Sequence, residues 1–376
     1  MPAATSPADD LQLEQQFQAQ LTAEIAAATA SLRRIATSLG EIDGGPVDAI
    51  EALMAGGKRM RARLCFWSWQ GHRARAISGT RADTDTVPVL AAASAIEFFQ
   101  AAALLHDDII DRSATRRGKP AAHKAFASSH RTMGMVGDDA HFGVGAAILA
   151  GDLALIQAND LAAHAGQLAG VAPAFNAAWH RMGVGVTLGQ YLDLASEAAP
   201  AWGQDPAHDE QRAWEVIVAK TAQYSVEYPL RFGAILAGAS EEELDEMSRV
   251  GIPLGEAFQL RDDVLGVFGD PKVTGKPAGD DIRENKRTVL LARTMAALRT
   301  ADQERLGALV NSGSYADSDV EWVTEMMVTS GAIDQVEGII NHKYAQATAA
   351  LAESSLSRRA QETLRHLADQ TVRRDR

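Results

Sequence analysis

The stretch HDDIIDRSATRRGKPAAH, from His106 to His123, places three carboxylates and two adjacent arginines directly after an apolar run. If that run is helical, Asp107 and Asp111 lie about one turn apart on the same face. Two like charges held this close repel each other unless a cation lies between them, and a hard divalent cation prefers oxygen ligands. Arg116 and Arg117 suit an anion such as a phosphate. Metal and arginines together predict a diphosphate substrate.

A second acidic cluster lies far downstream, in the stretch GEAFQLRDDVLGVFGD from Gly255 to Asp270. Asp262 and Asp263 again close an apolar helical run. A single cluster of this kind at a helix end is more often a solvated face than a metal site. Two of them, each followed by basic residues, favour a metal site in both places.

A basic stretch, GGKRMRARL, lies upstream of the first acidic cluster. Lys58, Arg59, Arg61 and Arg63 stand where a helix is predicted to begin after two glycines. A helix N-terminus preceded by glycines is a natural anion site. The plainer alternative is a solvated basic helix end, and this stretch alone does not decide between the two.

The bulk properties restrict the class of protein. The chain has 376 residues, 46% of them hydrophobic, so it can bury a large core. The formal net charge of −13 argues against nucleic acid as a partner. The lone Cys65 excludes an intrachain disulfide and a cysteine-based metal site. Neither a signal peptide nor a membrane span is predicted, so a cytoplasmic protein is expected.

The apolar periodicity predicts helices throughout, and no strand is expected. Residues 1–10 are predicted to form a flexible tail, and 11–376 a single all-α domain, a bundle of about ten or more helices. Residues 124–143 are expected to be irregular, and Pro229 is expected to kink the helix that contains it.

With these motifs in view, the sequence resembles the trans-isoprenyl diphosphate synthases, the head-to-tail prenyltransferase family also called polyprenyl synthetases. The resemblance runs roughly from GGKRMR to ENKRT, and one acidic motif alone would be weak. The ordered set is specific: GGKRMR (56–61), DDIID (107–111), RRGKP (116–120), GQYLD (189–193), KTAQY (220–224), FQLRDD (258–263), TGK (274–276) and ENKRT (284–288).

The resemblance implies an all-α fold around a deep central cavity, usually as a homodimer. In such enzymes the two acidic motifs face each other across the cavity mouth and bind three Mg²⁺ ions that hold an allylic diphosphate (dimethylallyl, geranyl or farnesyl). The implied metal residues of this chain are Asp107, Asp108, Asp111, Asp262 and Asp263.

The same resemblance assigns the substrate contacts. The implied contacts of the allylic diphosphate are Arg116, Lys220, Lys276 and Lys286, with Thr221 and Gln259 lining the reacting end; Arg116, Lys220, Thr221 and Gln259 are the implied catalytic residues. Isopentenyl diphosphate would bind through Lys58, Arg61 and Arg117, with Gln100 where the family often has histidine. Two other departures are Ala62, where proline is usual, and Gly266, where the second motif usually ends in a third aspartate.

The residues before the first motif are expected to set product length. Below Asp107 on a helix, Ala102 and Ala103 are small and Phe98 and Phe99 are bulky. Phe99 lies eight residues before Asp107, or roughly 12 Å along the axis. These phenylalanines are predicted to form the floor of the cavity and so to limit the product to geranylgeranyl diphosphate. They could instead be ordinary core residues, in which case a farnesyl product remains open.

Three other functions are weighed against a synthase. A class I terpene cyclase would carry a different second motif from DDVLGVFGD. A metal-dependent phosphohydrolase would need further histidines upstream of His106, where only His72 is present. A non-catalytic partner subunit that binds prenyl diphosphates would tend to lose acidic-motif residues, and this chain keeps them.

Overall fold

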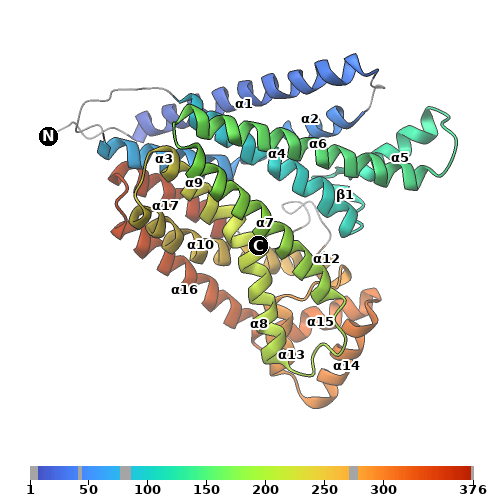
Figure 1. Ribbon diagram of the computed structural model, residues 1–376. Helices are drawn as coiled ribbons and strands as arrows, with labels where there is room; N and C mark the ends of the chain where they lie inside the picture. The colour runs from blue at the N-terminus through green and yellow to red at the C-terminus, as the bar shows by residue number, and fades with distance from the viewer. Residues whose placement is uncertain (1–6, 41–44, 77–85, 271–277, 374–376) are drawn as a thin grey trace. The chain divides into compact units, whose positions relative to one another are not determined.

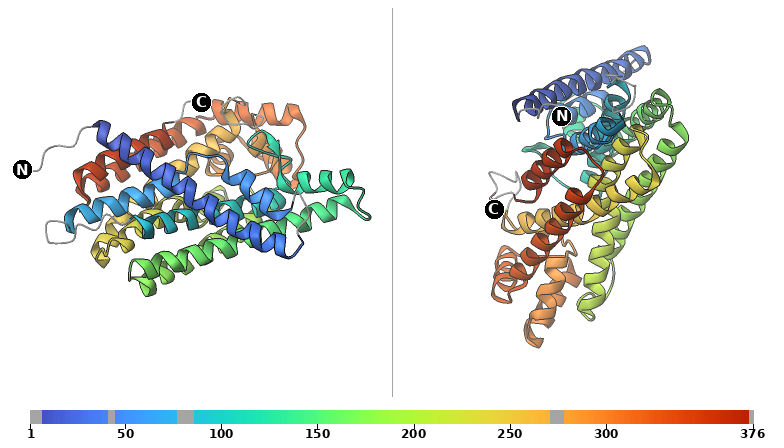
Figure 2. Two further views of the ribbon diagram at one scale, coloured as in Figure 1. Left: turned by 90° about the horizontal axis from the view of Figure 1, so that it is seen from above. Right: turned by 90° about the vertical axis from the view of Figure 1, so that its left-hand side faces the viewer.

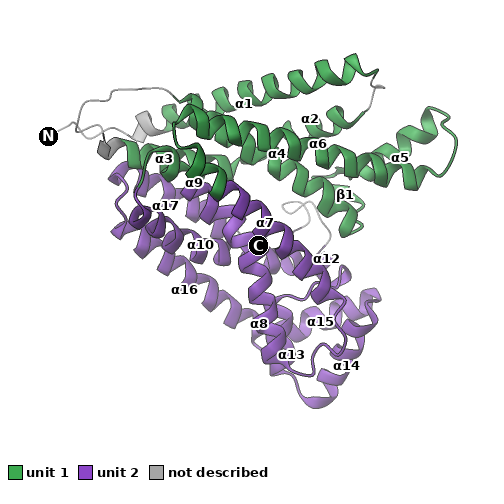
Figure 3. Cartoon of the chain, viewed as in Figure 1, with its two compact units in different colours: residues 1–177, 232–239 green, residues 178–231, 240–376 purple. Residues whose placement is uncertain are grey.

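The protein folds almost entirely as α-helices, in agreement with the sequence (Figure 1). The computed structural model describes residues 7–40, 45–76, 86–270 and 278–373. The chain divides into two compact units (Figure 3), and each is described separately below. Unit 1 comprises residues 1–177 and 232–239, and unit 2 comprises residues 178–231 and 240–376.

Unit 1 is built around α4 (Val87–Ile110), which packs against α3 (Met60–Ala76) and, along much of its length, against α6 (Asp139–Leu168). The contact face of α6 is lined with fully buried alanines at steps of three and four, which let the two backbones approach closely. These are Ala147, Ala150, Ala154 and Ala158. The other complete helices of unit 1 are α1 (Pro7–Ser38), α2 (Pro46–Met54) and α5 (Ala122–Thr132).

The first acidic motif ends α4, and a short hairpin follows it. Strands β1 (Thr115–Arg116) and β2 (Lys119–Pro120) pair antiparallel around a turn at Arg117 and Gly118, both of which have positive φ. The left-handed conformation of Arg117 is uncommon for a residue with a side chain. The hairpin thus turns the RRGKP segment back directly beyond the carboxylates.

Unit 2 is organised around α10 (Glu241–Phe268), which packs against the π-helix η1 (Ile217–Glu227) and α16 (Ala332–Glu353); α10 and α16 lie side by side (Figures 1 and 2). Two glycines of α10 allow the close approach to η1: a Cβ at Gly255 would lie 2.5 Å from the Ala222 Cα. Among the described residues of unit 2, the remaining helices lying wholly in it are α8 (Pro206–Val216), α12 (Asp280–Arg283), α13 (Val289–Ala297), α14 (Thr300–Ser312), α15 (Asp317–Thr329) and α17 (Arg358–Val372). Helices α7 (Ala172–Glu197) and α9 (Tyr228–Leu236) belong partly to each unit.

The KTAQY motif lies in η1, which ends at Glu227, two residues before Pro229. Proline has no N–H and clashes with the carbonyl four residues earlier, so the α-helical pattern cannot pass through it undisturbed. The N–H of Tyr228 instead donates to the carbonyl of Gln223, five residues back. A π-helical segment therefore stands where a kink was predicted, and such segments often occur at functional sites.

Two sequence predictions about local structure are wrong. Residues 124–143 were expected to be irregular, but most of them belong to α5 and α6, because His123, Phe126 and His130 bury one face of α5. The short β1–β2 hairpin was also not expected, since two residues a strand are too few for an alternating pattern. The first helix begins at Pro7, inside the predicted tail, whereas the single-domain boundaries stay a prediction.

Among the described residues, α4 and α6 are long and apolar enough to cross a membrane, judged by length and composition alone. The apolar window of α4 is 72% buried inside the protein, as in a core helix. That of α6 is only 28% buried. Its outward face carries Phe142, Leu149 and Ile156, which are spaced seven residues apart and are exposed.

Candidate active site

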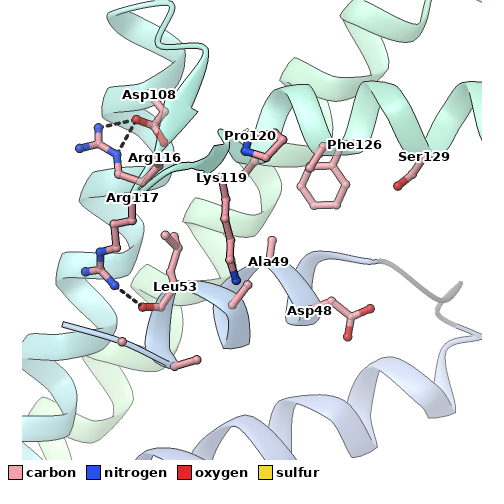
Figure 4. A pocket seen from close by; sticks show the side chains of 15 residues that line it. Asp48, Ala49, Leu53, Asp108, Arg116, Arg117, Lys119, Pro120, Phe126 and Ser129 are labelled. Carbon is pink, nitrogen blue, oxygen red and sulfur yellow. Dashed lines mark hydrogen bonds and ion pairs between the residues drawn. The ribbon is translucent and has the colours of Figure 1, made fainter. Parts of the chain in front are cut away.

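In the first acidic motif, Asp108 is more deeply buried than Asp107 and Asp111. The N–H of Asp111 donates to the carbonyl of Asp107 at 2.8 Å, so these two residues lie one helical turn apart, as predicted. Asp108, between them in sequence, is only 2% exposed. Its carboxylate accepts hydrogen bonds from Nε (2.8 Å) and Nη2 of Arg116, as Figure 4 shows. The buried Asp108 therefore holds Arg116 in place, and its predicted role as a metal ligand stays a prediction.

Arg116 is fixed beside the carboxylates by its charged neighbours. Burial by itself lowers the pKa of the guanidinium. The hydrogen bond to Asp108 and the charges of Asp108, Asp107 and Asp111 outweigh burial, and the pKa is raised. Nη2 also lies 3.9 Å from Asp107 Oδ2. A permanent cation thus stands next to the predicted metal ligands, where a diphosphate group would need it.

The structure brings the RRGKP and GGKRMR motifs together in unit 1. Arg117 donates from Nη1 to the carbonyl of Leu53 at 3.1 Å, and its guanidinium lies over Gly56 and Gly57 (Figure 4). A Cβ at Gly57 would lie 3.2 Å from Nη2 of Arg117, so the glycines make room for the arginine. Lys58 follows directly and is exposed.

A buried carboxylate on α4, that of Glu97, lies close to this basic cluster. The Glu97 side chain is 13% exposed and lies 3.7 Å from Nη1 of Arg59. Burial raises the pKa of Glu97, while the charges of Arg59, Arg61 and Arg117 act in the opposite direction. Glu97 thus holds Arg59 and places a negative charge near Arg61 and Arg117, two of the residues predicted to bind isopentenyl diphosphate. Gln100, which was predicted to contact isopentenyl diphosphate, lies three residues further along α4 and is half-buried.

A cavity of about 410 Å³ lies behind Arg116 and Arg117, between α2, the hairpin and α5 (Figure 4). Its wall is mostly apolar, with Phe126 and several alanines, and Lys119 extends into it from β2 toward Ala49. The cavity shares Asp108, Arg116 and Arg117 with the site just described.

In unit 2 the structure gathers most of the predicted allylic-site residues around one small cavity of about 80 Å³. Its polar lining includes Asp193, Lys220, Thr221, Gln259, Asp263 and Lys286. Lys220 Nζ lies 2.6 Å from Asp193 Oδ2, and Gln259 donates from Nε2 to Asp263 Oδ1 at 2.7 Å. Five residues predicted from separate motifs therefore line one pocket. Lys276 lies outside the described residues.

The two aspartates of the second motif differ in burial. Asp262 is half-buried, whereas Asp263 is 6% exposed. Burial raises the pKa of Asp263 to about 7, and the charges of Asp281 and Asp262 act in the same direction. The hydrogen bond from Gln259 and the charge of Lys286 oppose this rise. The Asp263 carboxylate thus lies inside the pocket, and that of Asp262 is more accessible to solvent.

The predicted cavity-floor residues are buried on α4. Phe98 is 0% exposed, Phe99 7% and Ala102 3%, while Ala103 is half-buried. Burial of this kind fits a cavity floor and equally fits an ordinary core, so the role of these side chains stays a prediction.

Sequence reasoning missed four residues that shape the two sites. Their contacts, except that between Asp281 and Lys286, join segments far apart in the chain. For Glu97 and Arg261 the indication in the sequence was a charged residue within a largely apolar helical stretch. Arg261 donates to both carboxylate oxygens of Glu337 at 2.7 Å and to the carbonyl of Val372 at 2.9 Å, which ties α10 to α16 and α17. The other two are Asp193 and Asp281.

The side chains suit a magnesium ion by their chemistry. Within the described parts of the chain, no three His, Cys, Asp or Glu side chains converge on one point. Magnesium does not require such a cage, since it keeps several waters and is commonly held by one or two carboxylates together with substrate phosphates. Asp107 and Asp111 in unit 1, and Asp262 in unit 2, are carboxylates of this kind.

Fold and side chains together define an all-helical protein whose carboxylates and cations are grouped as in proteins that bind a metal-associated diphosphate. The family model described as polyprenyl synthetase matches residues 47–327. The chain therefore belongs to the polyprenyl synthetase family.

Two similar sequences and one solved structure illustrate the match. Geranylfarnesyl diphosphate synthase of Aeropyrum pernix is 32% identical over 302 residues, which cover 77% of this chain and 81% of the relative. Geranylgeranyl diphosphate synthase of Sulfolobus acidocaldarius is 30% identical over 85% of this chain and 88% of the relative. Geranylgeranyl pyrophosphate synthase of Corynebacterium glutamicum, crystallised with isoprenyl diphosphate and magnesium, has a TM-score of 0.82 and 34% identity over 96% of this chain and 99% of its own.

Proposed function

We propose that this protein is a magnesium-dependent head-to-tail trans-prenyltransferase that condenses isopentenyl diphosphate with allylic diphosphates to geranylgeranyl diphosphate. The observation that carries the proposal is the pocket in unit 2, where Lys220, Thr221, Gln259, Asp263 and Lys286 from three separate motifs line one cavity. The accessible carboxylates at the end of α4, with Arg116 fixed beside them, support it from unit 1.

The chemistry requires an allylic diphosphate to ionise to a carbocation. Bound magnesium would supply positive charge that stabilises the departing diphosphate. Three ions are proposed, held by Asp107, Asp111 and Asp262. Arg116, Lys220 and Lys286 would be the protein cations on the same diphosphate, already fixed before charge develops, which is the arrangement that lowers a barrier. Lys276 is proposed with them.

Isopentenyl diphosphate would be bound by the separate basic cluster of unit 1. Lys58, Arg61 and Arg117 are the proposed phosphate contacts, and Gln100 can donate a hydrogen bond. The double bond of isopentenyl diphosphate then attacks the cation, and the released diphosphate takes the proton. The apolar wall of α4 would keep water away from the cation.

Product length is proposed to be twenty carbons. Related proteins of similar identity are named for different products: the 28%-identical protein of Mycobacterium tuberculosis is a nonaprenyl diphosphate synthase, and the 30%-identical protein of the same organism is a geranylgeranyl diphosphate synthase. Identity alone therefore does not decide the length. What supports twenty carbons is that small side chains precede the first motif and that Phe98 and Phe99 lie roughly 12 Å below Asp107.

The protein is further proposed to act as a cytoplasmic homodimer. The support is the outward face of α6, where Phe142, Leu149 and Ile156 form an apolar stripe and are 39%, 62% and 65% exposed. A second copy of the chain would cover such a stripe and remove it from water.

Product analysis tests the proposed activity. The purified protein is incubated with Mg²⁺, isopentenyl diphosphate and each of dimethylallyl, geranyl and farnesyl diphosphate, and the products are dephosphorylated and identified. The expected result is all-trans geranylgeraniol from each primer, and none when Mg²⁺ is chelated. Farnesol as the final product would correct the chain length. No condensation with any primer would contradict the proposed activity.

A further inference from the structure

The second acidic motif has glycine where a third aspartate is usual in the family, yet the position is not open space. A Cβ added at Gly266 would overlap the side chain of Asp281, with Oδ1 only 2.8 Å away and the rest of the carboxylate closer still. The carboxylate of Asp281 thus lies against the α10 backbone where the side chain of residue 266 would begin. Asp281 itself is 8% exposed.

The backbone fixes Asp281 in this place. The N–H of Gly279 donates to the carbonyl of Val267 at 3.1 Å, which ties the segment before α12 to the end of α10. The N–H of Lys286 donates to the carbonyl of Asp281 at 3.0 Å, a bond within the same segment. The first bond therefore holds the segment beside the acidic motif and the second fixes its own fold, so Asp281 is not a mobile surface carboxylate.

Asp281 also contacts a residue of the proposed site. Its Oδ1 lies 3.1 Å from Nζ of Lys286, which lines the same cavity as Asp263. Asp281 thus adds negative charge to the second acidic cluster and orients a lysine of the diphosphate site.

We propose that Asp281 supplies the third carboxylate of the second acidic cluster in place of residue 266, and that Gly266 is required because Asp281 occupies its side-chain space. This proposal deepens the proposed function and rests on it. In this arrangement one carboxylate serves two purposes: it supports the cations that come with the diphosphate, and it positions Lys286.

The first test concerns packing and does not depend on activity. Gly266→Asp places a side chain where the Asp281 carboxylate lies, so its Tm should fall by several degrees. Adding Asp281→Ala removes the obstacle, and the double variant should recover most of the lost Tm. A Gly266→Asp variant as stable as the original protein, or a double variant no more stable than Gly266→Asp, would overturn the packing relationship.

The second test measures binding of inorganic diphosphate by calorimetry, with Mg²⁺ and with a chelator. Asp281→Asn should weaken binding in Mg²⁺ by about tenfold or more, as expected for the loss of a charged contact. It should not weaken binding in the chelator, since losing a negative charge does not disfavour an anion. Gly266→Asp/Asp281→Ala should regain part of the affinity in Mg²⁺. The matched control is Asp280→Asn, which removes the neighbouring carboxylate and should bind as the original protein does.

The other possible results of the calorimetry each have a single interpretation. Equal binding by Asp281→Asn and the original protein in Mg²⁺ overturns the proposal. An equal loss with and without Mg²⁺ limits Asp281 to holding Lys286 and overturns its part in the acidic cluster. If the unaltered protein binds no diphosphate in Mg²⁺ and makes no product, the proposed function itself fails, and the Tm measurements still decide whether Gly266 and Asp281 share one space.

Discussion

The ammonium group of Lys220 lies 2.6 Å from the carboxylate of Asp193, which joins the KTAQY and GQYLD motifs. The same arrangement recurs at Lys286 with Asp281 and at Arg116 with Asp108. A long cationic side chain loses considerable rotamer entropy when it is ordered. A carboxylate partner orders each of these three side chains in the absence of substrate, which is the preorganisation that the proposed diphosphate site needs.

Replacing Asp193 tests this preorganisation. Asp193→Asn keeps the size of the side chain and removes the charge that holds Lys220, so we expect kcat/KM for the allylic substrate to fall by about tenfold or more. The KM for isopentenyl diphosphate should change much less. Steady-state kinetics with each substrate varied in turn measures both. The control is Asp245→Asn, an exposed carboxylate of α10. Equal effects on both substrates would contradict a specific role for the pair.

Glu97 provides a second prediction, in unit 1. Glu97→Gln leaves Arg59, Arg61 and Arg117 near a buried position without its negative charge. Burial already disfavours the charge of Glu97 and raises its pKa, which offsets the loss of the ion pair with Arg59. We therefore expect the free energy of unfolding in urea to change by no more than about 1 kcal/mol, and the KM for isopentenyl diphosphate to rise more than that for the allylic substrate. An unchanged KM for isopentenyl diphosphate would contradict the positioning role.

The raised pKa of Asp263 predicts how stability depends on pH in the metal-free protein. The carboxyl keeps its proton in the folded state up to about pH 7 but loses it near the ordinary value of 3.8 when unfolded. Its contribution is therefore complete at low pH and is lost as pH rises toward about 7, with a slope of at most about 1.4 kcal/mol per pH unit. The expected result is that Asp263→Asn gains stability relative to the original protein as pH rises.

Urea unfolding of both proteins in a chelator, between about pH 5 and about pH 8, measures this difference. Comparing the two proteins cancels the titration of all other groups, provided that these are unchanged. A stability difference that stays constant with pH would mean that Asp263 titrates normally.

The apolar stripe on α6 predicts an assembly. Leu149→Arg places a charge in the middle of the stripe, and a charge left buried against a second copy would be strongly unfavourable. We expect the variant to dissociate to monomers in sedimentation experiments at protein concentrations where the original is dimeric. Gln20→Arg, an exposed position on α1, adds the same charge elsewhere and should leave the assembly intact. An original protein that sediments as a monomer would refute the dimer.

Whether a contact could be predicted from the sequence depended on whether it is local or joins distant segments. Asp107 and Asp111 could be placed on one face because a single helical turn joins them, and helical periodicity is a local property. The burial of Asp108 was not foreseen, since it depends on where Arg116 returns after the hairpin. Residue types and order predicted that Lys220, Gln259 and Lys286 act together, through resemblance to a family.

The missed contacts are those that depend on packing alone. Nothing in DDVLGVFGD indicates that the side chain of a residue fifteen positions later lies over Gly266. Likewise, the bond between Arg261 and Glu337 spans 76 residues, and no short pattern encodes it. Such contacts arise where α10, α16 and the segment around α12 meet, so only the three-dimensional arrangement reveals them.

The final prediction concerns product length and the buried phenylalanines of α4. If Phe99 is part of the cavity floor, Phe99→Ala lets the growing chain pass, and the main product should lengthen by at least one five-carbon unit. Truncating a buried phenylalanine also costs about 3–5 kcal/mol, so the protein should be assayed well below its Tm. Phe126→Ala is the matched control, because it truncates another buried phenylalanine of unit 1, on α5. Chromatography of the dephosphorylated products should show longer alcohols for Phe99→Ala only. If both variants keep the original product, Phe99 is a core residue and the length is set elsewhere in the cavity.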